Sequence, residues 1–463
     1  MQKRIAEVSV TALQGMFNYK VRFPDNGDNV ILIAPNGYGK TALLSLLNNC
    51  LQLKFDEASK QSFKSLTVKF EDQTVWTFEK EREKLDSRTT HRLNSDRERR
   101  SEKPTRDWVR LTITDPRGQK VESMPAGGTE RIPIDILAEA LDFTLPIVRV
   151  EYDMFRDLPT EDSLTIPEVI ERYRETLSTD NDFRRRLGSY AVDFTTPSPD
   201  RPTCVFIETQ RLLYARKSAR REAGTTSGPE EEISREGNYL AKILQAAHQN
   251  YASTSQALDE SFPNRLIARA AKSGPRDLPS LRAAFDMIER RRKFLIEAGI
   301  LIETSEPLRL PPDKDLDSVA DALAIYLDDS KAKLSTFDDI YPKVSVFRAL
   351  LNKKLKPKEL QISRERGAFV TRQNETIDLV GLSSGEKHEF IMLFKLIFET
   401  PPSSLVLIDE PEISLHVLWQ LEFMPDLFEI QEANRFQAII ATHSPQIFQG
   451  VEHLIVDLAD QAY

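Results

Sequence analysis

One segment near the N-terminus constrains the fold of this chain more than any other. Its sequence is Ala34-Pro35-Asn36-Gly37-Tyr38-Gly39-Lys40-Thr41, and it lies between an apolar run at residues 30–33 and a helical stripe of leucines at residues 43–51. A glycine-containing loop that joins a buried strand to a helix turns successive backbone N–H groups toward one anion. The segment therefore predicts a phosphate-binding loop within an α/β fold.

We expect this loop to hold ATP together with a Mg²⁺ ion. The Lys40 ammonium can reach the β and γ phosphates, and the Thr41 hydroxyl can bind the metal. Ala34 occupies the position of the first glycine in the usual pattern, which leaves the entry angle of the loop open. The expected nucleotide-binding residues of the loop are Pro35, Asn36, Gly37, Tyr38, Gly39, Lys40, Thr41 and Ala42.

Two adjacent carboxylates follow an apolar run near the other end of the chain. The run occupies residues 405–408 and ends in Asp409 and Glu410, whose side chains leave a strand in different directions. We expect Asp409 to hold Mg²⁺ through water, and Glu410 to polarise the attacking water as a general base. By itself, an Asp-Glu pair at a strand end is as often an exposed surface feature as a catalytic pair. The presence of Lys40 and Thr41 favours the catalytic interpretation.

A third segment, Leu382-Ser383-Ser384-Gly385-Glu386, directly precedes an apolar helix expected at residues 390–398. It resembles the signature loop of ABC-type ATPases. That resemblance implies that Ser383, Ser384, Gly385 and Glu386 bind the γ phosphate of a nucleotide held by a second subunit. The same sequence is also an ordinary helix cap, in which Glu386 helps to cap the helix. Its position shortly before Asp409 favours the signature interpretation.

Later segments continue the order of an ABC-type head. A strand expected at residues 436–442 ends at His443, where a family member has a catalytic switch histidine that contacts the γ phosphate. Ser414, Leu415 and His416 match the loop that contacts the other subunit. Gln210 ends the apolar strand expected at residues 204–207, and it is the expected glutamine ligand of Mg²⁺.

The pattern as a whole predicts an α/β, ABC-type P-loop ATPase head assembled from both chain ends, with a helical insertion in the middle. Alternating runs predict strands at residues 6–10 and 20–23 and a hairpin that turns at Asp72-Gln73. Apolar residues at helical spacing dominate residues 212–354, where Gly and Pro mark only the gaps. We expect residues 1–211 and 355–463 to form the head, and residues 212–354 to contact a partner or another copy.

Composition limits the partners and the compartment. There are 63 Lys and Arg residues against 72 Asp and Glu residues, and the net charge of −9 excludes a polycation that coats nucleic acid. Basic residues at 88–106 and 211–221 are either local phosphate contacts or exposed surface. Two cysteines, the lack of an apolar leader and the lack of an apolar run of about 20 residues predict a cytoplasmic protein without a membrane span.

Both chain ends resemble the stand-alone ABC ATPases of the OLD and SMC-like group. The resemblance rests on the phosphate loop, on residues 13–19, on residues 379–416 and on the Ala-Thr-His-Ser-Pro-Gln sequence around His443. The most similar forms are the ATPase subunits of bacterial anti-phage systems, PARIS first and Septu next. This resemblance implies a homo-oligomeric ATPase that holds a nuclease effector subunit, and that releases or activates it in response to a phage-encoded trigger.

Only residues 444–463 follow His443, so we expect no nuclease domain at that place, and we expect any cleavage to come from a partner. An alternative function is that of an SMC-like or DNA-repair ATPase that binds DNA directly. A transporter's nucleotide-binding subunit is a third. A neighbouring nuclease gene would favour the first function, and ATP-stimulated DNA binding would favour the second.

Overall fold

The head of the molecule is built on a parallel sheet to which both ends of the chain contribute. The computed structural model describes residues 3–24, 27–84, 105–125, 134–150, 154–159, 163–173, 176–177, 180–187, 202–208, 229–270, 277–302, 310–373, 375–413 and 415–461. Within these residues the strand order is β11-β15-β16-β3-β17, and all neighbours pair in parallel. The strands are β11 (Cys204–Glu208), β15 (Leu405–Asp409), β16 (Gln437–Ala441), β3 (Asn29–Ile33) and β17 (Ile455–Asp457).

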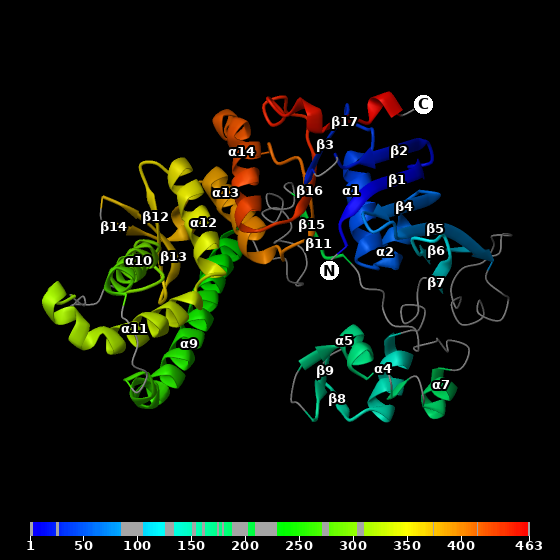
Figure 1. Ribbon diagram of the computed structural model, residues 1–463. Coiled ribbons are helices and arrows are strands. Elements are labelled where there is room, and N and C mark those ends of the chain that lie inside the picture. The colour runs from blue at the N-terminus through cyan, green and yellow to red at the C-terminus, as the bar shows by residue number, and fades with distance from the viewer. Residues whose placement is uncertain are drawn as a thin grey trace.

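The N-terminal strand β3 lies between two C-terminal strands. Ile31 pairs with Ile440 of β16 on one side and with Ile455 of β17 on the other. Every residue of β15 and β16 is buried, as is typical of parallel strands whose two faces are both covered. The arrangement confirms the predicted fold class, an α/β head assembled from both chain ends (Figure 1).

A second, antiparallel sheet belongs to the N-terminal part of the head, and its strand order is β2-β1-β4-β5-β6-β7. Its strands are β1 (Ile5–Leu13), β2 (Phe17–Arg22), β4 (Ser65–Phe70), β5 (Val75–Lys84), β6 (Thr105–Thr114) and β7 (Lys120–Pro125). The predicted hairpin is confirmed, because β4 pairs with β5 and Gln73 in the turn has a φ of 66°. Leucines of α1 (Lys40–Leu51) share one hydrophobic core with residues of both sheets, and α2 (Phe55–Lys60) follows α1.

A small unit with its own hydrophobic core follows these strands. It contains α4 (Ile134–Thr144), α5 (Ile166–Arg172) and α7 (Asn181–Leu187), and a sheet of β8 (Ile147–Arg149), β9 (Met154–Asp157) and β10 (Ser163–Thr165) in the order β10-β9-β8. From the sequence, short helices are expected near residues 135–141 and 167–177, where α4 and α5 lie, and the three strands are not predicted. These strands are too short to show a clear alternation of apolar and polar residues.

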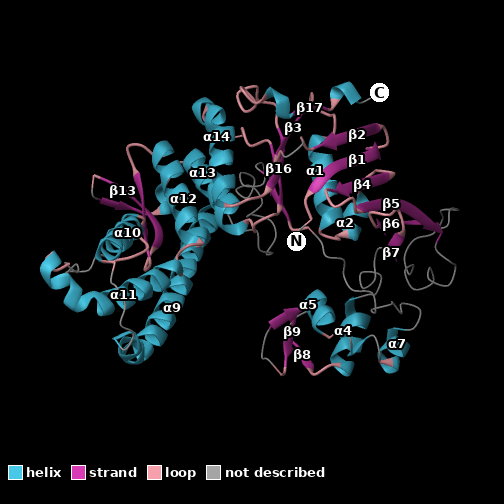
Figure 2. Cartoon of the chain, in the orientation of Figure 1, coloured by secondary structure: helices cyan, strands magenta, loops and turns pink. Residues whose placement is uncertain are grey.

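The middle of the chain is helical, as predicted. It comprises α9 (Pro229–Ala270), α10 (Leu278–Glu297), α11 (Asp313–Ser335) and α12 (Ile340–Lys354), and α9, α10 and α11 extend away from the parallel sheet (Figure 2). Pro263 lies inside α9, so the expectation that prolines mark only the gaps between helices is wrong. The proposed boundaries of this insertion, 212 and 354, remain a prediction.

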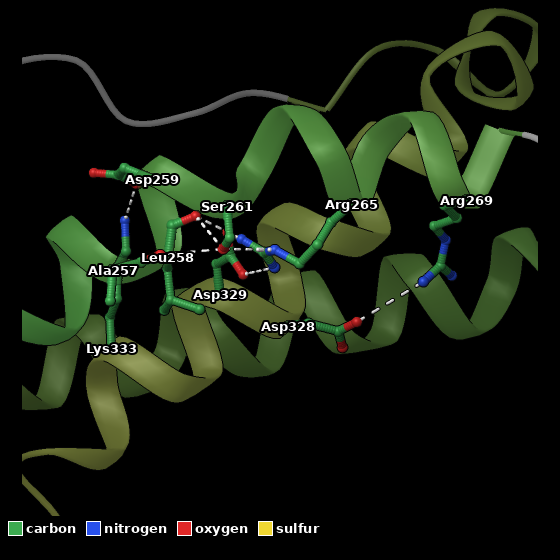
Figure 3. A network of polar contacts seen from close by, with 9 residues as sticks. All are labelled: Ala257, Leu258, Asp259, Ser261, Arg265, Arg269, Asp328, Asp329 and Lys333. Carbon is green, nitrogen blue, oxygen red and sulfur yellow. Dashed lines mark hydrogen bonds and ion pairs between the residues drawn. The ribbon is translucent and has the colours of Figure 1, made fainter.

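Ion pairs fix α11 against the far half of α9, as Figure 3 shows. The Arg265 guanidinium pairs with both carboxylate oxygens of Asp329 and also donates to the Leu258 carbonyl. Lys333 Nζ lies 2.9 Å from Asp259 Oδ1. Side chains from two helices therefore hold this end of the insertion together.

A fourth sheet and two further helices join the insertion to the head. Strands β12 (Glu359–Ser363), β13 (Gly367–Arg372) and β14 (Glu375–Ile377) form an antiparallel sheet that α9 contacts. Helix α13 (Ser384–Phe394) continues into a π-helical turn, η3 (Lys395–Glu399), and α14 (Val417–Ala433) follows β15. Short 3-10 turns are η2 (Leu379–Gly381), η4 (Glu452–Leu454) and η5 (Ala459–Gln461). Among the described helices, none has the length and apolarity that crossing a membrane requires.

Candidate active site

The predicted phosphate loop joins β3 to α1 and has the backbone that an anion site needs. Gly37 and Gly39 have φ values of +89° and +76°, which residues with a side chain rarely adopt. A Cβ added at Gly37 would meet no described heavy atom within 4 Å, so the backbone conformation, and not crowding, favours glycine there. The first turn of α1 contains no acidic residue, which leaves the positive end of the helix dipole available to an anion.

Lys40 connects this loop to the C-terminal half of the head. Its ammonium group donates to the Ala34 carbonyl at 2.9 Å and lies 2.5 Å from His443 Nε2, which is 403 positions away in the chain. Burial lowers the pKa of Lys40, against the opposing effect of Glu410, Asp409 and Glu412. The lysine is thus a desolvated cation that faces three carboxylates.

Two of the three predicted metal-binding side chains, Thr41 and Asp409, lie in contact. Asp409 at the end of β15 is buried and has a side-chain hydrogen bond with Thr41. Burial raises the pKa of Asp409 to about 6, with smaller effects from Thr41, Glu410 and Glu208. A hydroxyl and a carboxylate oxygen beside the phosphate loop are ligand types that Mg²⁺ prefers, so these residues fit that ion.

Glu410 begins the loop after β15 in an unusual backbone conformation. Its φ is +50°, and its N–H donates to the Ala441 carbonyl at 2.8 Å. A left-handed residue other than glycine costs on the order of 1–3 kcal/mol, and such residues concentrate at functional sites. Glu410 Oε1 lies 3.7 Å from His443 Nε2, and His443 Nε2 also lies beside the Lys40 ammonium. The predicted base, switch histidine and phosphate-binding lysine are therefore neighbours in one site.

The loop after β15 holds Glu412, a residue of the site that is not predicted from the sequence. Glu412 accepts a hydrogen bond from the His443 backbone N–H at 2.6 Å and another from the Thr442 hydroxyl at 2.9 Å. The only sequence signal for it is its position in the Asp-Glu-Pro-Glu segment. One sequence does not reveal which donors a carboxylate in a loop will meet.

The predicted signature segment forms the N-terminus of α13. Ser383 is the N-cap, and Glu386 completes a capping box with it, which confirms the predicted capping role of Glu386. Glu386 also forms an ion pair with Lys358, 2.7 Å apart. Burial alone would raise the pKa of Glu386, but Lys358 and the Ser383 N–H outweigh it and the pKa is lowered. Ser383 and Ser384 are exposed, and the predicted contact of this segment with another subunit's nucleotide stays a prediction.

Other predicted site residues are only partly described. Gln210, the expected metal ligand, lies outside the described residues, as do Ser414 and the basic residues at 211–221. His416 is described: it is the exposed N-cap of α14, and its Nδ1 accepts from the Leu418 N–H at 3.3 Å. The expected subunit contact of this loop remains a prediction.

Comparison with known protein families identifies the chain. Residues 161–448, more than half of its length, match the family described as "AAA domain, putative AbiEii toxin, Type IV TA system". The chain belongs to this family. The matched region includes β15, Glu410 and His443, and it starts after the phosphate loop that β3 and α1 contribute.

Other similarities to this AAA-domain protein are partial or weak. It is 34% identical to Protein ea59 of Escherichia phage lambda over 93 residues, which are 20% of this chain and 18% of that protein. The Smc head domain of Pyrococcus furiosus, solved with part of ScpA, aligns over 98% of this chain and 93% of its own, with 13% identity and a TM-score of 0.32. A second Smc head bound to ScpA aligns over the same shares with 11% identity and a TM-score of 0.34.

Proposed function

We propose that this AAA-domain protein binds and hydrolyses ATP at the site formed by the phosphate loop and the ends of β15 and β16. The observation that carries the proposal is the meeting of Lys40, Glu410 and His443, which come from opposite ends of the chain. Membership of an AAA-domain family supports it independently.

Each side chain has a chemical role in this proposal. The Lys40 ammonium and the N–H groups at the start of α1 neutralise the phosphates, since both present positive charge to an anion. Thr41 and Asp409 would hold Mg²⁺, which when bound would supply positive charge to neutralise the phosphates. Glu410 accepts the proton of the attacking water, and His443 donates to the γ phosphate.

We further propose that two copies close around the nucleotide. The Ser383 and Ser384 side chains are exposed at the N-terminus of α13, where a helix dipole favours negative charge. The proposed arrangement, an ATP sandwich, places this segment of one copy over the triphosphate held by Lys40 of another.

The biological setting that we propose is bacterial defence against phage. In it, the ATPase holds a separately encoded nuclease effector and releases or activates it when a phage-encoded trigger appears. The toxin–antitoxin description of the family supports such a setting. The closer resemblance to the PARIS ATPase rests on the sequence motifs alone.

Two experiments test these proposals. The first measures ATP hydrolysis per subunit across a dilution series, for the wild type and for Lys40→Ala. We expect activity to fall on dilution and to be lost in the variant, and a fully active monomer would contradict the sandwich. The second is co-purification with the products of neighbouring genes, with and without ATP. Capture of a nuclease supports the defence role, whereas ATP-stimulated DNA binding by the chain alone would favour the SMC-like alternative.

A further inference from the structure

Glu412 makes two contacts that fix the end of β16. Its Oε1 accepts from the backbone N–H of His443 at 2.6 Å, and its Oε2 accepts from the Thr442 hydroxyl at 2.9 Å. Both donors belong to consecutive residues, so the carboxylate holds this piece of backbone at two points. Hydrogen bonds to an ionised acceptor are roughly twice as strong as bonds between neutral groups.

The hydrogen bonds continue from Thr442 to α14. The Thr442 hydroxyl accepts from the Ser444 N–H at 3.0 Å, and the Ser444 hydroxyl lies 2.6 Å from Gln420 Oε1. The Gln420 amide nitrogen donates to the Leu415 carbonyl at 3.1 Å. The loop after β15 and the loop after β16 are therefore joined through side chains at both ends of His443.

This network fixes the backbone from which the His443 ring extends. With its own N–H held by Glu412, the residue places Nε2 at 2.5 Å from Lys40 Nζ and at 3.7 Å from Glu410 Oε1. Thr442 is fully buried, and its N–H donates to the Leu32 carbonyl of β3, so the backbone before the histidine is fixed as well. Loss of the Glu412 contacts would leave the His443 backbone N–H without the hydrogen bond that holds it.

We propose that Glu412 is a positioning residue for ATP hydrolysis, which holds His443 at the γ phosphate through the two hydrogen bonds to residues 442 and 443. This inference rests on the proposed function. A carboxylate suits the task because it accepts on both oxygens, whereas a glutamine amide offers one accepting oxygen and turns an N–H₂ group toward one of the two donors.

The test compares steady-state ATPase kinetics of Glu412→Ala and Glu412→Gln with the wild type. Misplacement of a catalytic group by about 1 Å can cost about 100-fold, so we expect kcat to fall between about 10- and 100-fold in Glu412→Ala, and less in Glu412→Gln. We expect KM for ATP to change less than about threefold, because Lys40 and the phosphate loop are intact. Glu432→Gln removes the same charge from an exposed position on α14 and should leave both constants unchanged.

Double variants separate positioning from a merely structural role. If Glu412 acts through His443, then Glu412→Ala/His443→Ala should be no slower than His443→Ala alone, within about twofold. Thr442→Ser keeps the hydroxyl and should retain activity, whereas Thr442→Val should lose part of it. Equal kcat in Glu412→Ala and wild type, or multiplied losses in the double variant, would overturn the inference. A wild type without ATPase activity would instead overturn the proposed function.

Discussion

A buried lysine at the end of α12 makes a strong prediction about stability. Lys354 has 1% of its side chain exposed, and its ammonium lies 3.1 Å from Glu389 of α13 and 2.7 Å from Asp426 of α14. Burial opposes the charge of Lys354, but the two carboxylates outweigh this effect and its pKa is raised. One cation therefore neutralises buried acids on the helix that starts at the signature segment and on the helix that follows the acid pair.

We expect Lys354→Met to destabilise the folded chain by about 3–5 kcal/mol at pH 7, because removal of one partner leaves buried carboxylates without their counter-ion. The neighbouring Lys353 provides a matched control. It pairs with Glu422, 3.0 Å away, and lies 3.8 Å from Asp426, but 49% of its side chain is exposed. Exposed pairs contribute about 0–1 kcal/mol, so Lys353→Met should cost no more than that.

The pH dependence of this difference has a definite sign. Burial raises the pKa values of Glu389 and Asp426 above their ordinary 4.5 and 3.8, even with Lys354 present. A raised folded-state pKa means that the folded protein binds the proton more tightly than the unfolded chain does, so protonation favours folding. Lys354 lowers both pKa values, so its removal raises them further in Lys354→Met than in the wild type. The variant therefore gains more from protonation than the wild type does, and its deficit should shrink as the pH falls from 7.

The free energies of unfolding can be measured by urea unfolding of both variants and the wild type. Circular dichroism follows the unfolding at a series of pH values from 7 to 5. Equal stabilities of the two methionine variants at pH 7 would refute the reasoning. A deficit that grows as the pH is lowered would refute it as well.

Three further predictions concern the site and the core. Glu410→Gln should bind ATP but not hydrolyse it, and size-exclusion chromatography with ATP should show a persistent dimer; rapid turnover in this variant would exclude Glu410 as the base. Glu386→Ala should lower the free energy of unfolding by about 1–2 kcal/mol, because it breaks the capping box with Ser383, and an unchanged urea midpoint would argue against that cap. Burial raises the pKa of Cys50, and it raises the pKa of Cys204 to about 12. Neither thiol should therefore react with a disulfide reagent at pH 8 until the protein is unfolded. Fast labelling of the native protein would contradict their burial.

The sequence predicts much of the head because local patterns specify it. The glycines at 37 and 39, the strand before them and the helix after them follow from residue types over about 20 positions, and the structure has these elements where expected. The assembly of the head from both chain ends also follows, since the motifs at the two ends belong to one site, whereas the pairing of β3 with β16 is seen only in the structure.

Features that depend on distant contacts could not be predicted in this way. Glu412 meets donors 30 and 31 positions away, and Lys354 meets carboxylates on two other helices. In the sequence, both are ordinary charged residues in polar surroundings. Their burial and their partners arise from packing, which a single sequence does not specify.

In the proposed ATP sandwich, each nucleotide lies between the phosphate loop of one copy and the signature segment of another. Mixing two inactive variants tests it directly: Lys40→Ala has an intact signature segment, and Ser384→Arg, at an exposed position, has an intact phosphate loop. After random exchange of subunits, half of the dimers contain one intact composite site, so the mixture should recover about a quarter of the wild-type activity per subunit. A mixture as inactive as its two components, measured at the same total concentration, would contradict the claim.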